Sequence, residues 1–463
     1  MKNRIKHLHF VGIGGVGMSG IAELMHHRGF EVSGSDLADG RMIDNLRASG
    51  IQVSIGHDAA HLREADVVVR STAIDAGNPE IIEAGRRGIP IISRAEILAE
   101  AMRGKQGIAI SGTHGKTTTT ALVSHILVEA GRDPTALVGG WVQRGPGQSG
   151  GAVIGEGDWL VTEADESDGS FLHLHPSISV VTNIDADHLD HYGGMGALED
   201  AFLRFANNLP FWGAAILCTD HARVRTLADK VKGRVVRYGI HSDADLRAQN
   251  IQTSELGMKF TVEHEGTEVG SVDLPLPGTH NIENALAAIA VVLEVGVPFE
   301  IAAEAIAGFR GVARRFELKG SEAGVRVVDD YGHHPIEVQA TLEAARAQHT
   351  GRIVTVFQPH RFSRTRDCMS DFSGAFFASD VLIVGDTYAA GEAPIEGASA
   401  EDLTTAIQTS GHTDARYVGA LSENVEAIGG LLRDGDLVLT LGAGDVTRLG
   451  PQLLDFLAGG ART

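Results

Sequence analysis

A phosphate-binding loop is the clearest chemical signature of the chain. The segment SGTHGKTT, residues 111–118, follows an expected strand at residues 108–110 and precedes a helical pattern. Backbone amides of such a loop form an anion nest, Lys116 reaches the β- and γ-phosphates, and the Thr117 hydroxyl can ligate Mg²⁺. Ile110 replaces the first glycine of the usual pattern, but the Gly-Lys-Thr register is intact. We therefore predict a purine nucleoside triphosphate on Gly112, Thr113, His114, Gly115, Lys116, Thr117 and Thr118.

Two acidic clusters follow this loop in the sequence. The first ends one expected strand and the second follows a strand expected to end at Asn183 to Asp185; the members are Glu163, Asp165, Glu166 and Asp168, then Asp187, His188, Asp190 and His191. If both strands neighbour the loop's own strand in a parallel sheet, these groups surround the triphosphate. Carboxylate oxygens suit Mg²⁺, and an imidazole could complete a second metal site. The alternative to a metal-binding role, for any single one of these acids, is that it is a solvated loop residue.

A second glycine loop lies near the N-terminus. Gly12-x-Gly14-x-x-Gly17 follows a strand expected at residues 8–11 and opens a helix expected from Met18, and Asp36 ends the next strand. This is the context of the dinucleotide fingerprint, in which backbone approaches a pyrophosphate at a helix N-terminus. The pattern indicates a pyrophosphate without saying whose, since NAD and a UDP-sugar both carry one. A tight turn with no ligand is the simpler alternative.

The elements that must position these loops alternate in the α/β manner. Strand-length hydrophobic runs alternate with helical patterns, and the alternation restarts near Gln106 and Arg326. We expect three α/β domains, each on a mainly parallel sheet with flanking helices. They are a Rossmann-like domain at 1–104, a central P-loop domain at 105–312 and a second Rossmann-like domain at 313–463. Residues 240–275 instead alternate as antiparallel strands do, before helices expected at 281–295 and 301–309.

Composition narrows the classes of partner. The net charge of −21 excludes nucleic acid as a bulk partner, because phosphate backbones need a basic surface. The N-terminal apolar stretch is broken by glycines and lacks a cleavage site, so we expect a cytoplasmic protein with no membrane partner. Cys218 and Cys368 match no metal or disulfide spacing, and the expectation is that they are idle thiols in a reducing compartment.

Six motifs, in order and suitably spaced, together resemble one family. They are GTHGKTTT from Gly112, EADESDGSF from Glu163, TNIDADHLD from Thr182, GTHNIENALAA from Gly278, GVARRFE from Gly311 and DDYGHHP from Asp329. The chain resembles the Mur ligases of peptidoglycan assembly along essentially its whole length. QPHRFSRTRD from Gln358 and GIGGVGMSGIAE from Gly12 are most similar to the members that add alanine.

The resemblance implies an ATP-dependent ligase that uses Mg²⁺, with two ions expected. It would join the lactyl carboxylate of UDP-N-acetylmuramate to L-alanine through an acyl phosphate, releasing ADP and phosphate, as a monomer or homodimer. Some relatives hold magnesium with a carbamylated lysine after the DH motif. Here no lysine lies between Lys116 and Lys230, so that device is absent.

Site residues follow from the same resemblance. Lys116, Glu163, His188, Arg315 and His333 are expected to be catalytic, and Thr117, Glu163 and His188 to hold magnesium. Adenine and nucleotide contacts fall on Asn281, Asn284, Arg315 and Asp330, and the UDP site on Gly14, Gly15, Asp36 and Ser71. The alanine pocket falls on Tyr331, His333, His360, Arg361 and Arg364. The base that deprotonates the amine stays open, with His333 one candidate.

Three rival interpretations remain at this point. If the chain were a dehydrogenase, NAD binding would account for the first glycine loop, but the phosphate loop would have no function. A P-loop regulator keeps Lys116 but needs neither Asp330 nor the arginines at 361 and 364, whose guanidinium forks suit a carboxylate better than solvent. Within the family, another amino-acid-adding ligase, a peptide recycler or a folylpolyglutamate synthetase is the nearest competitor.

Overall fold

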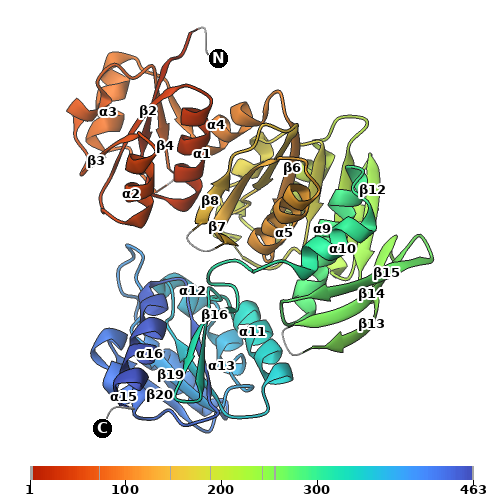
Figure 1. Cartoon of the computed structure of the whole chain (residues 1–463). Coiled ribbons are helices and arrows are strands. Elements are labelled where there is room, and N and C mark those ends of the chain that lie inside the picture. Colours follow the sequence, from red (N-terminus) through yellow and green to blue (C-terminus); the bar gives the residue numbers. More distant parts are fainter. Residues whose placement is uncertain are drawn as a thin grey trace. The chain divides into compact units, whose positions relative to one another are not determined.

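Three separate β-sheets organise the chain (Figure 1). The computed structural model describes residues 4–71, 73–145, 148–187, 189–241, 243–254 and 257–460. By compactness the chain divides into two units. The first is Met1–Gln249, Thr261–Val272 and Glu283–Arg310, and the second is Asn250–Phe260, Asp273–Ile282 and Gly311–Thr463.

The first sheet has five strands in the order β3-β2-β1-β4-β5, and every pair is parallel. Its strands are β1 (His7–Val11), β2 (Glu31–Asp36), β3 (Gln52–Ile55), β4 (Val67–Arg70) and β5 (Ile91–Ser93). Its helices are α1 (Val16–His27), α2 (Arg41–Ala48), α3 (Pro79–Arg87) and α4 (Arg94–Met102), with a 3₁₀ turn η1 (Ala59–Leu62). The chain reverses its direction of winding between β1 and β4, which is where ligands bind open parallel sheets.

The second sheet has ten strands in the order β15-β14-β13-β12-β11-β10-β6-β9-β7-β8. The strands are β6 (Gln106–Ser111), β7 (Thr135–Gly145), β8 (Gln148–Val153), β9 (Trp159–Glu163), β10 (Ile178–Val181), β11 (Ala214–Cys218), β12 (Arg234–Gly239), β13 (Leu246–Thr253), β14 (Met258–His264) and β15 (Thr267–Leu274). The helices are α5 (Lys116–Glu129), α6 (Leu189–Tyr192), α7 (Met195–Asn207), α8 (Ala222–Ala228), α9 (Thr279–Glu294) and α10 (Phe299–Ala307), with η2 (Ser170–His173). Its central strands, β12 through β7, are parallel.

The segment expected to be antiparallel, residues 240–275, forms β13, β14 and β15 at one end of this sheet, where β13 pairs with β12 in parallel and β14 is joined to β15 as a hairpin. Only Glu265 and Gly266 join β14 to β15, both with positive φ, 49° and 79°. A two-residue connection of this conformation can join only antiparallel neighbours. The helices expected at 281–295 and 301–309 are α9 and α10, and α10 packs on α5.

The third sheet has six strands in the order β16-β17-β21-β18-β19-β20, antiparallel only at the β16 edge. The strands are β16 (Glu317–Glu322), β17 (Val325–Asp330), β18 (Ile353–Phe357), β19 (Val381–Gly385), β20 (Ala415–Gly419) and β21 (Leu437–Leu441). The helices are α11 (Pro335–Gln348), α12 (Phe362–Asp367), α13 (Met369–Gly374), α14 (Ala400–Thr409), α15 (Val425–Gly429) and α16 (Leu449–Gly460), with η3 (Leu421–Glu423) and η4 (Asp445–Arg448).

Alternate residues of this third sheet enter two different hydrophobic cores. Leu437 and Leu439 of β21 pack into one core with Leu342, whereas Val438 packs into the other with Leu453. Helices therefore cover both faces, which explains why the strands are almost continuously hydrophobic. The predicted α/β class with mainly parallel sheets is confirmed. In the described ranges no helix is long and apolar enough to cross a membrane.

Two boundaries differ from the sequence expectations. Helix α1 begins at Val16, two residues before Met18, with Gly15 as its N-cap. Strand β10 ends at Val181 instead of continuing to Asn183–Asp185. The first loop is shorter than expected and the second begins earlier, because the conformation of a loop depends on contacts that periodicity does not reveal.

A substitution tests the close packing of β2 against β1. A Cβ at Gly34 would lie 2.6 Å from both the Phe10 carbonyl oxygen and Ile13 Cδ1. We expect Gly34→Ala to destabilise the fold by about 1–3 kcal/mol through overpacking, seen as a lower apparent Tm in calorimetry of the full chain. Gly85→Ala is the matched control, because no atom lies within 4 Å of its added methyl. That helical change should be neutral or stabilising by about 0.5–1 kcal/mol; equal losses in both variants would contradict the packing argument.

Candidate active site

The phosphate loop lies between two neighbouring strands that carry acids. Strand β6 pairs in parallel with β9 on one side and β10 on the other, in a register that sets Ile110 opposite Glu163 and Ser111 opposite Val181. The loop at the carboxyl end of β6 is therefore flanked by the segments that follow β9 and β10. The structure brings Glu166 of the first predicted acidic segment to the loop, and from the β10 side it brings Thr182, Asn183 and Asp185.

Two glycines give the loop its shape. Gly112 has φ 135°, and a Cβ there would meet the Thr182 hydroxyl at 2.0 Å. Gly115 has φ 85° and caps α5, and its Cβ would lie 2.4 Å from Asn284 Oδ1. Only glycine adopts these conformations without strain, so the loop can turn tightly and expose its amides. Thr117 and Thr118 follow in the first turn of α5, both buried.

Lys116 is held by a buried carboxylate. Its Nζ donates to Glu166 Oε1 and Oε2, both at 2.8 Å, and to the Gly112 carbonyl at 2.6 Å. Glu166 is only 2% exposed. Burial would lower the pKa of Lys116, but the carboxylates of Glu166 and Asp165 outweigh it and raise the pKa above its usual value. The lysine is therefore a fixed positive charge at the loop, as phosphate binding requires.

The segment after β10 holds the loop from the other side. Asn183 accepts from the His114 amide at 2.7 Å through Oδ1 and donates to the His114 carbonyl at 3.1 Å through Nδ2. The Thr182 hydroxyl also donates to the His114 carbonyl, at 2.6 Å, and the Asp185 amide donates to Thr113 Oγ1 at 2.9 Å. Sequence reasoning gave Glu166, Thr182 and Asn183 no role in holding the loop. The available signal was their position at the ends of predicted neighbouring strands.

The predicted magnesium ligands are only partly described. Glu163 ends β9, where its Oε1 accepts from the Gly139 amide, and it acts electrostatically on Lys116. Thr117 is one residue beyond Lys116 in α5. His188 lies outside the described residues, so its position stays a prediction. The oxygen donors of Thr117 and Glu163 beside a phosphate loop fit Mg²⁺, which prefers oxygen ligands and substrate phosphates.

The two asparagines predicted at adenine lie in the first turns of α9 and are both buried. Asn281 Nδ2 donates to the Pro277 carbonyl at 2.7 Å. Asn284 Oδ1 accepts from the Thr119 hydroxyl of α5 at 3.2 Å. The same oxygen is the atom that a Cβ on Gly115 would meet. Asn284 thus lies at the phosphate loop itself, whereas Asn281 stabilises the entry to α9.

The N-terminal glycine loop gathers the predicted UDP residues at the β1/β4 switch point. The Gly14 amide donates to Asp36 Oδ2 at 2.8 Å, and a Cβ on Gly14 would collide with that carboxylate at 2.9 Å. The Ser71 amide, just after β4, donates to the Val11 carbonyl at 3.2 Å. Gly15 is the N-cap of α1. Asp36 therefore braces the loop through one carboxylate oxygen.

In the C-terminal sheet, Asp330 organises the predicted nucleotide residues. It ends β17, is buried, and accepts from the Phe316 amide at 2.8 Å and the Gly332 amide at 2.7 Å. Burial raises the pKa of Asp330, and Arg315 opposes this. The guanidinium of Arg315 lies over the Tyr331 ring, 5.3 Å from its centroid. Asp330 thereby fixes the backbone directly after Arg315 and directly after Tyr331.

The predicted alanine residues of this sheet form a row of rings. The centroids of Tyr331 and His333 are 5.2 Å apart, and those of His333 and His360 are 5.7 Å apart. His360 stacks on Tyr388 at 5.4 Å with the planes 9° apart. Tyr388 was missed by sequence reasoning, because it follows a different strand, β19, and no motif marks it.

Burial keeps both histidines of this row neutral. It lowers the pKa of His333 to about 4, with Arg364 adding to the effect and Glu337 opposing it. It lowers the pKa of His360 to about 4 as well, helped by His333 and Arg364. Arg361 has φ 70° and donates its amide to the Tyr388 carbonyl at 2.9 Å, at the start of α12. Burial and the positive charge of Arg364 thus act in the same direction on both rings.

Three protein-family models match successive parts of the chain. They are "Mur ligase family, catalytic domain" at residues 7–106, "Mur ligase middle domain" at residues 110–292 and "Mur ligase, glutamate ligase domain" at residues 314–444. A protein of Anaeromyxobacter sp. (strain Fw109-5) named UDP-N-acetylmuramate–L-alanine ligase is 51% identical over 98% of this chain and 99% of its own. The chain belongs to the Mur ligase family.

Further relatives of this Mur ligase carry the same name. A UDP-N-acetylmuramate–L-alanine ligase of Geobacter sp. (strain M21) is 49% identical over 98% of both chains. Among solved structures, UDP-N-acetylmuramate–alanine ligase MurC from Thermotoga maritima superposes with a TM-score of 0.83 at 28% identity, covering 98% of this chain and 100% of that one. A murein peptide ligase from Psychrobacter arcticus gives 0.73 at 25% identity, covering 98% of both.

A double-mutant cycle tests the buried ion pair of this Mur ligase. We expect Glu166→Leu to cost about 3–5 kcal/mol, because it leaves Lys116 charged and unpaired. Lys116→Met should cost less, because burial raises the pKa of Glu166 to about 7 and its carboxyl can take up a proton. The double variant should lose less free energy of unfolding than the two single variants lose when added together, because it leaves no unpaired charge. Urea denaturation followed by circular dichroism measures all four proteins. Additive losses would show that the two groups do not interact as the distances indicate.

A pH titration tests the protonation states of the C-terminal histidines. In an NMR titration we expect His333 to take up its proton near pH 4, well below its usual 6.5, because burial disfavours the imidazolium. The unfolded chain protonates this residue near pH 6.5, so its contribution to stability is lost as the pH falls from about 6.5 to 4. His221, whose pKa Glu283 raises against the effect of burial, is the internal control. Assignment uses His333→Gln and His221→Gln; His333 titrating at or above 6.5 would contradict the burial argument.

Proposed function

We propose that this Mur ligase joins L-alanine to the lactyl carboxylate of UDP-N-acetylmuramate at the expense of ATP, for peptidoglycan precursor synthesis in the cytoplasm. One observation carries the proposal: Lys116 is charged, partly buried and hydrogen-bonded within a phosphate loop that acid-bearing strands flank, in a chain 51% identical to a ligase of that name. Two relatives named for alanine addition support alanine over other amino acids.

The chemistry explains why ATP is needed. A carboxylate and an amine do not condense in water, because the carboxylate has no usable leaving group. In-line attack of the carboxylate on the γ-phosphorus gives an acyl phosphate and ADP. The alanine amine then attacks the acyl carbon, and phosphate leaves from the tetrahedral intermediate. Lys116 stabilises charge on the transferring oxygens in both steps.

We assign the nucleotide to Gly112, Thr113, His114, Gly115, Lys116, Thr117, Thr118, Asn281, Asn284, Arg315 and Asp330. Thr117, Glu163 and His188 would hold magnesium, with two ions proposed. When bound, Mg²⁺ neutralises phosphate charge. The neutral amide side chain of Asn284 suits hydrogen bonding to the adenine base. The guanidinium of Arg315 suits a phosphate.

The UDP moiety is assigned to Gly14, Gly15, Asp36 and Ser71 at the β1/β4 switch point. The cap of α1 has no side-chain hydrogen bond, and helix N-termini stabilise phosphate. Asp36 contributes mainly by holding the Gly14 amide in place. These residues belong to the domain that we propose at 1–104, followed by domains at 105–312 and 313–463.

The alanine pocket is assigned to Tyr331, His333, His360, Arg361 and Arg364. The arginine forks match the carboxylate of the amino acid. His333 is the candidate base for the amine, because it is neutral and its Nδ1 lies 3.1 Å from the Tyr331 carbonyl and 3.3 Å from Glu337 Oε2. These contacts fix the ring and leave Nε2 as the proton acceptor.

The decisive assay is phosphate release from ATP with UDP-N-acetylmuramate and each of the twenty amino acids in turn. We expect alanine to give the fastest release, Mg²⁺ to be required, and Lys116→Ala to lower kcat by roughly 10²- to 10³-fold or more, since a preorganised charge at the transferring group is lost. Lys230→Ala, an exposed lysine, is the matched control and should keep wild-type rates. Phosphate release that ignores the sugar nucleotide and alanine would refute the proposal.

A further inference from the structure

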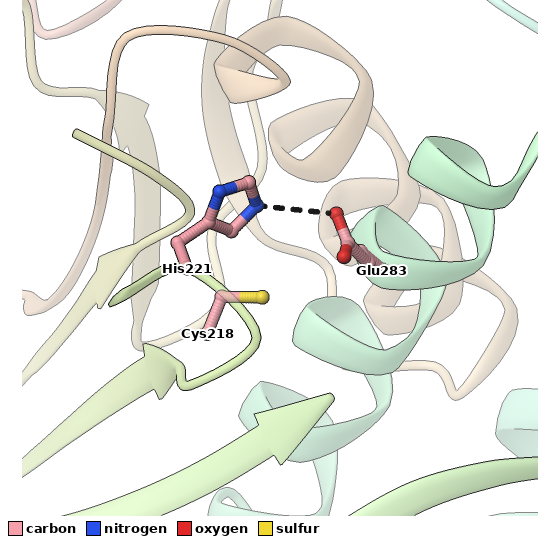
Figure 2. Close-up of side chains that lie close together, drawn as sticks. All are labelled: Cys218, His221 and Glu283. Atoms are coloured by element: carbon pink, nitrogen blue, oxygen red, sulfur yellow. Dashed lines mark hydrogen bonds and ion pairs between the residues drawn. The ribbon is translucent and has the colours of Figure 1, made fainter. Parts of the chain in front are cut away.

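A group of three metal-ligating side chains lies outside the residues assigned to the reaction. Cys218 ends β11, His221 is the N-cap of α8 and Glu283 is the fifth residue of α9. One ligand atom from each lies within 4.8 Å of the other two. Figure 2 shows the Cys218 sulfur and the His221 ring both turned toward the Glu283 carboxylate. All three belong to the same compact unit.

The spacing is close to that of a tetrahedral site. Bonds of about 2.0–2.3 Å to zinc at tetrahedral angles set ligand atoms roughly 3.3–3.6 Å apart. His221 Nε2 and Glu283 Oε2 are already 3.4 Å apart, which is long for a hydrogen bond and suited to a shared ion. Only the Cys218 sulfur has to approach, by about 1 Å at most, which a change in χ1 can supply.

The donor set selects the class of ion. A thiolate, an imidazole and a carboxylate match Zn²⁺ and its transition-metal neighbours, whereas Mg²⁺ takes oxygen ligands almost exclusively. The site is reachable, because the side chains of His221 and Glu283 are 33% and 22% exposed while Cys218 is fully buried behind them. The carboxylate of the neighbouring Asp220 accepts from the amides of Ile240 and His241 and is not among the three grouped ligand atoms.

We propose that Cys218, His221 and Glu283 bind one Zn²⁺-class ion, with water completing the coordination. The Cys218 thiol loses its proton to the buffer as the ion binds, because the thiolate is the ligand. The ion joins three elements, β11, α8 and the N-terminal part of α9. It therefore stabilises the N-terminal part of α9, where Asn284 follows Glu283.

The test uses untagged, chelator-treated full-length protein and Co²⁺ as a spectroscopic probe. We expect one Co²⁺ per chain, with a thiolate-to-metal absorption band in the near ultraviolet and visible bands of tetrahedral intensity. Zn²⁺ should displace Co²⁺ and raise the apparent Tm. Wild-type protein without a thiolate band would overturn the proposal.

Variants locate the site. Cys218→Ser should abolish the thiolate band, and Glu283→Gln should weaken Co²⁺ binding by roughly 100-fold or more, since loss of even a ligand's supporting partner costs about 10–100-fold. Glu283→Gln keeps the buried thiol and so reports on binding even if Cys218→Ser folds poorly. Cys368→Ser is the matched control, because Cys368 also has an imidazole nearby, with His334 Nε2 3.9 Å from its sulfur. A band that survives Cys218→Ser and vanishes in Cys368→Ser would refute the assignment.

Discussion

The parallel pairing of β6 with β9 and β10 is the constraint on which the candidate site depends. Because all three strands run the same way, their carboxyl ends share one edge, and everything that follows them meets there. The β9 side supplies Glu163 and Glu166, and the β10 side supplies the groups that hold His114. A one-residue slip of either strand would turn these side chains to the opposite face of the sheet.

That edge carries the ion pair of Lys116 and Glu166, whose removal from water costs desolvation free energy. Taking Lys116 and Glu166 out of water costs several kcal/mol per ion, and their attraction repays it only with good geometry. The 2.8 Å contacts to both carboxylate oxygens and the donation to the Gly112 carbonyl supply that geometry. The result adds little to net stability but leaves a charged lysine in a dry, preformed loop, which is what stabilisation of a phosphoryl group demands.

Burial also sets the chemistry of the other groups that we have assigned. The same desolvation that Lys116 overcomes through its carboxylates is decisive at His333 and His360, where arginines reinforce it and the rings stay neutral. At Cys218 burial raises the pKa of the thiol, so only a cation that bonds sulfur directly can make it a thiolate. In each case the neighbours decide which protonation state the protein can use.

Local patterns in the sequence determined the α/β class, the two glycine loops, Lys116 and the pairing of acids with strand ends, because each depends on a few adjacent residues whose conformation is local. Contacts between distant segments could not be predicted in this way. Glu166 as the partner of Lys116, Asn284 over Gly115 and Tyr388 on His360 each join segments that periodicity treats as independent. The clearest case is Cys218, which its spacing in the sequence marks as idle. Only the folding of α9 against the end of β11 brings Glu283 to it, since strand order and helix packing are decided by the burial of the whole hydrophobic core and not by any motif.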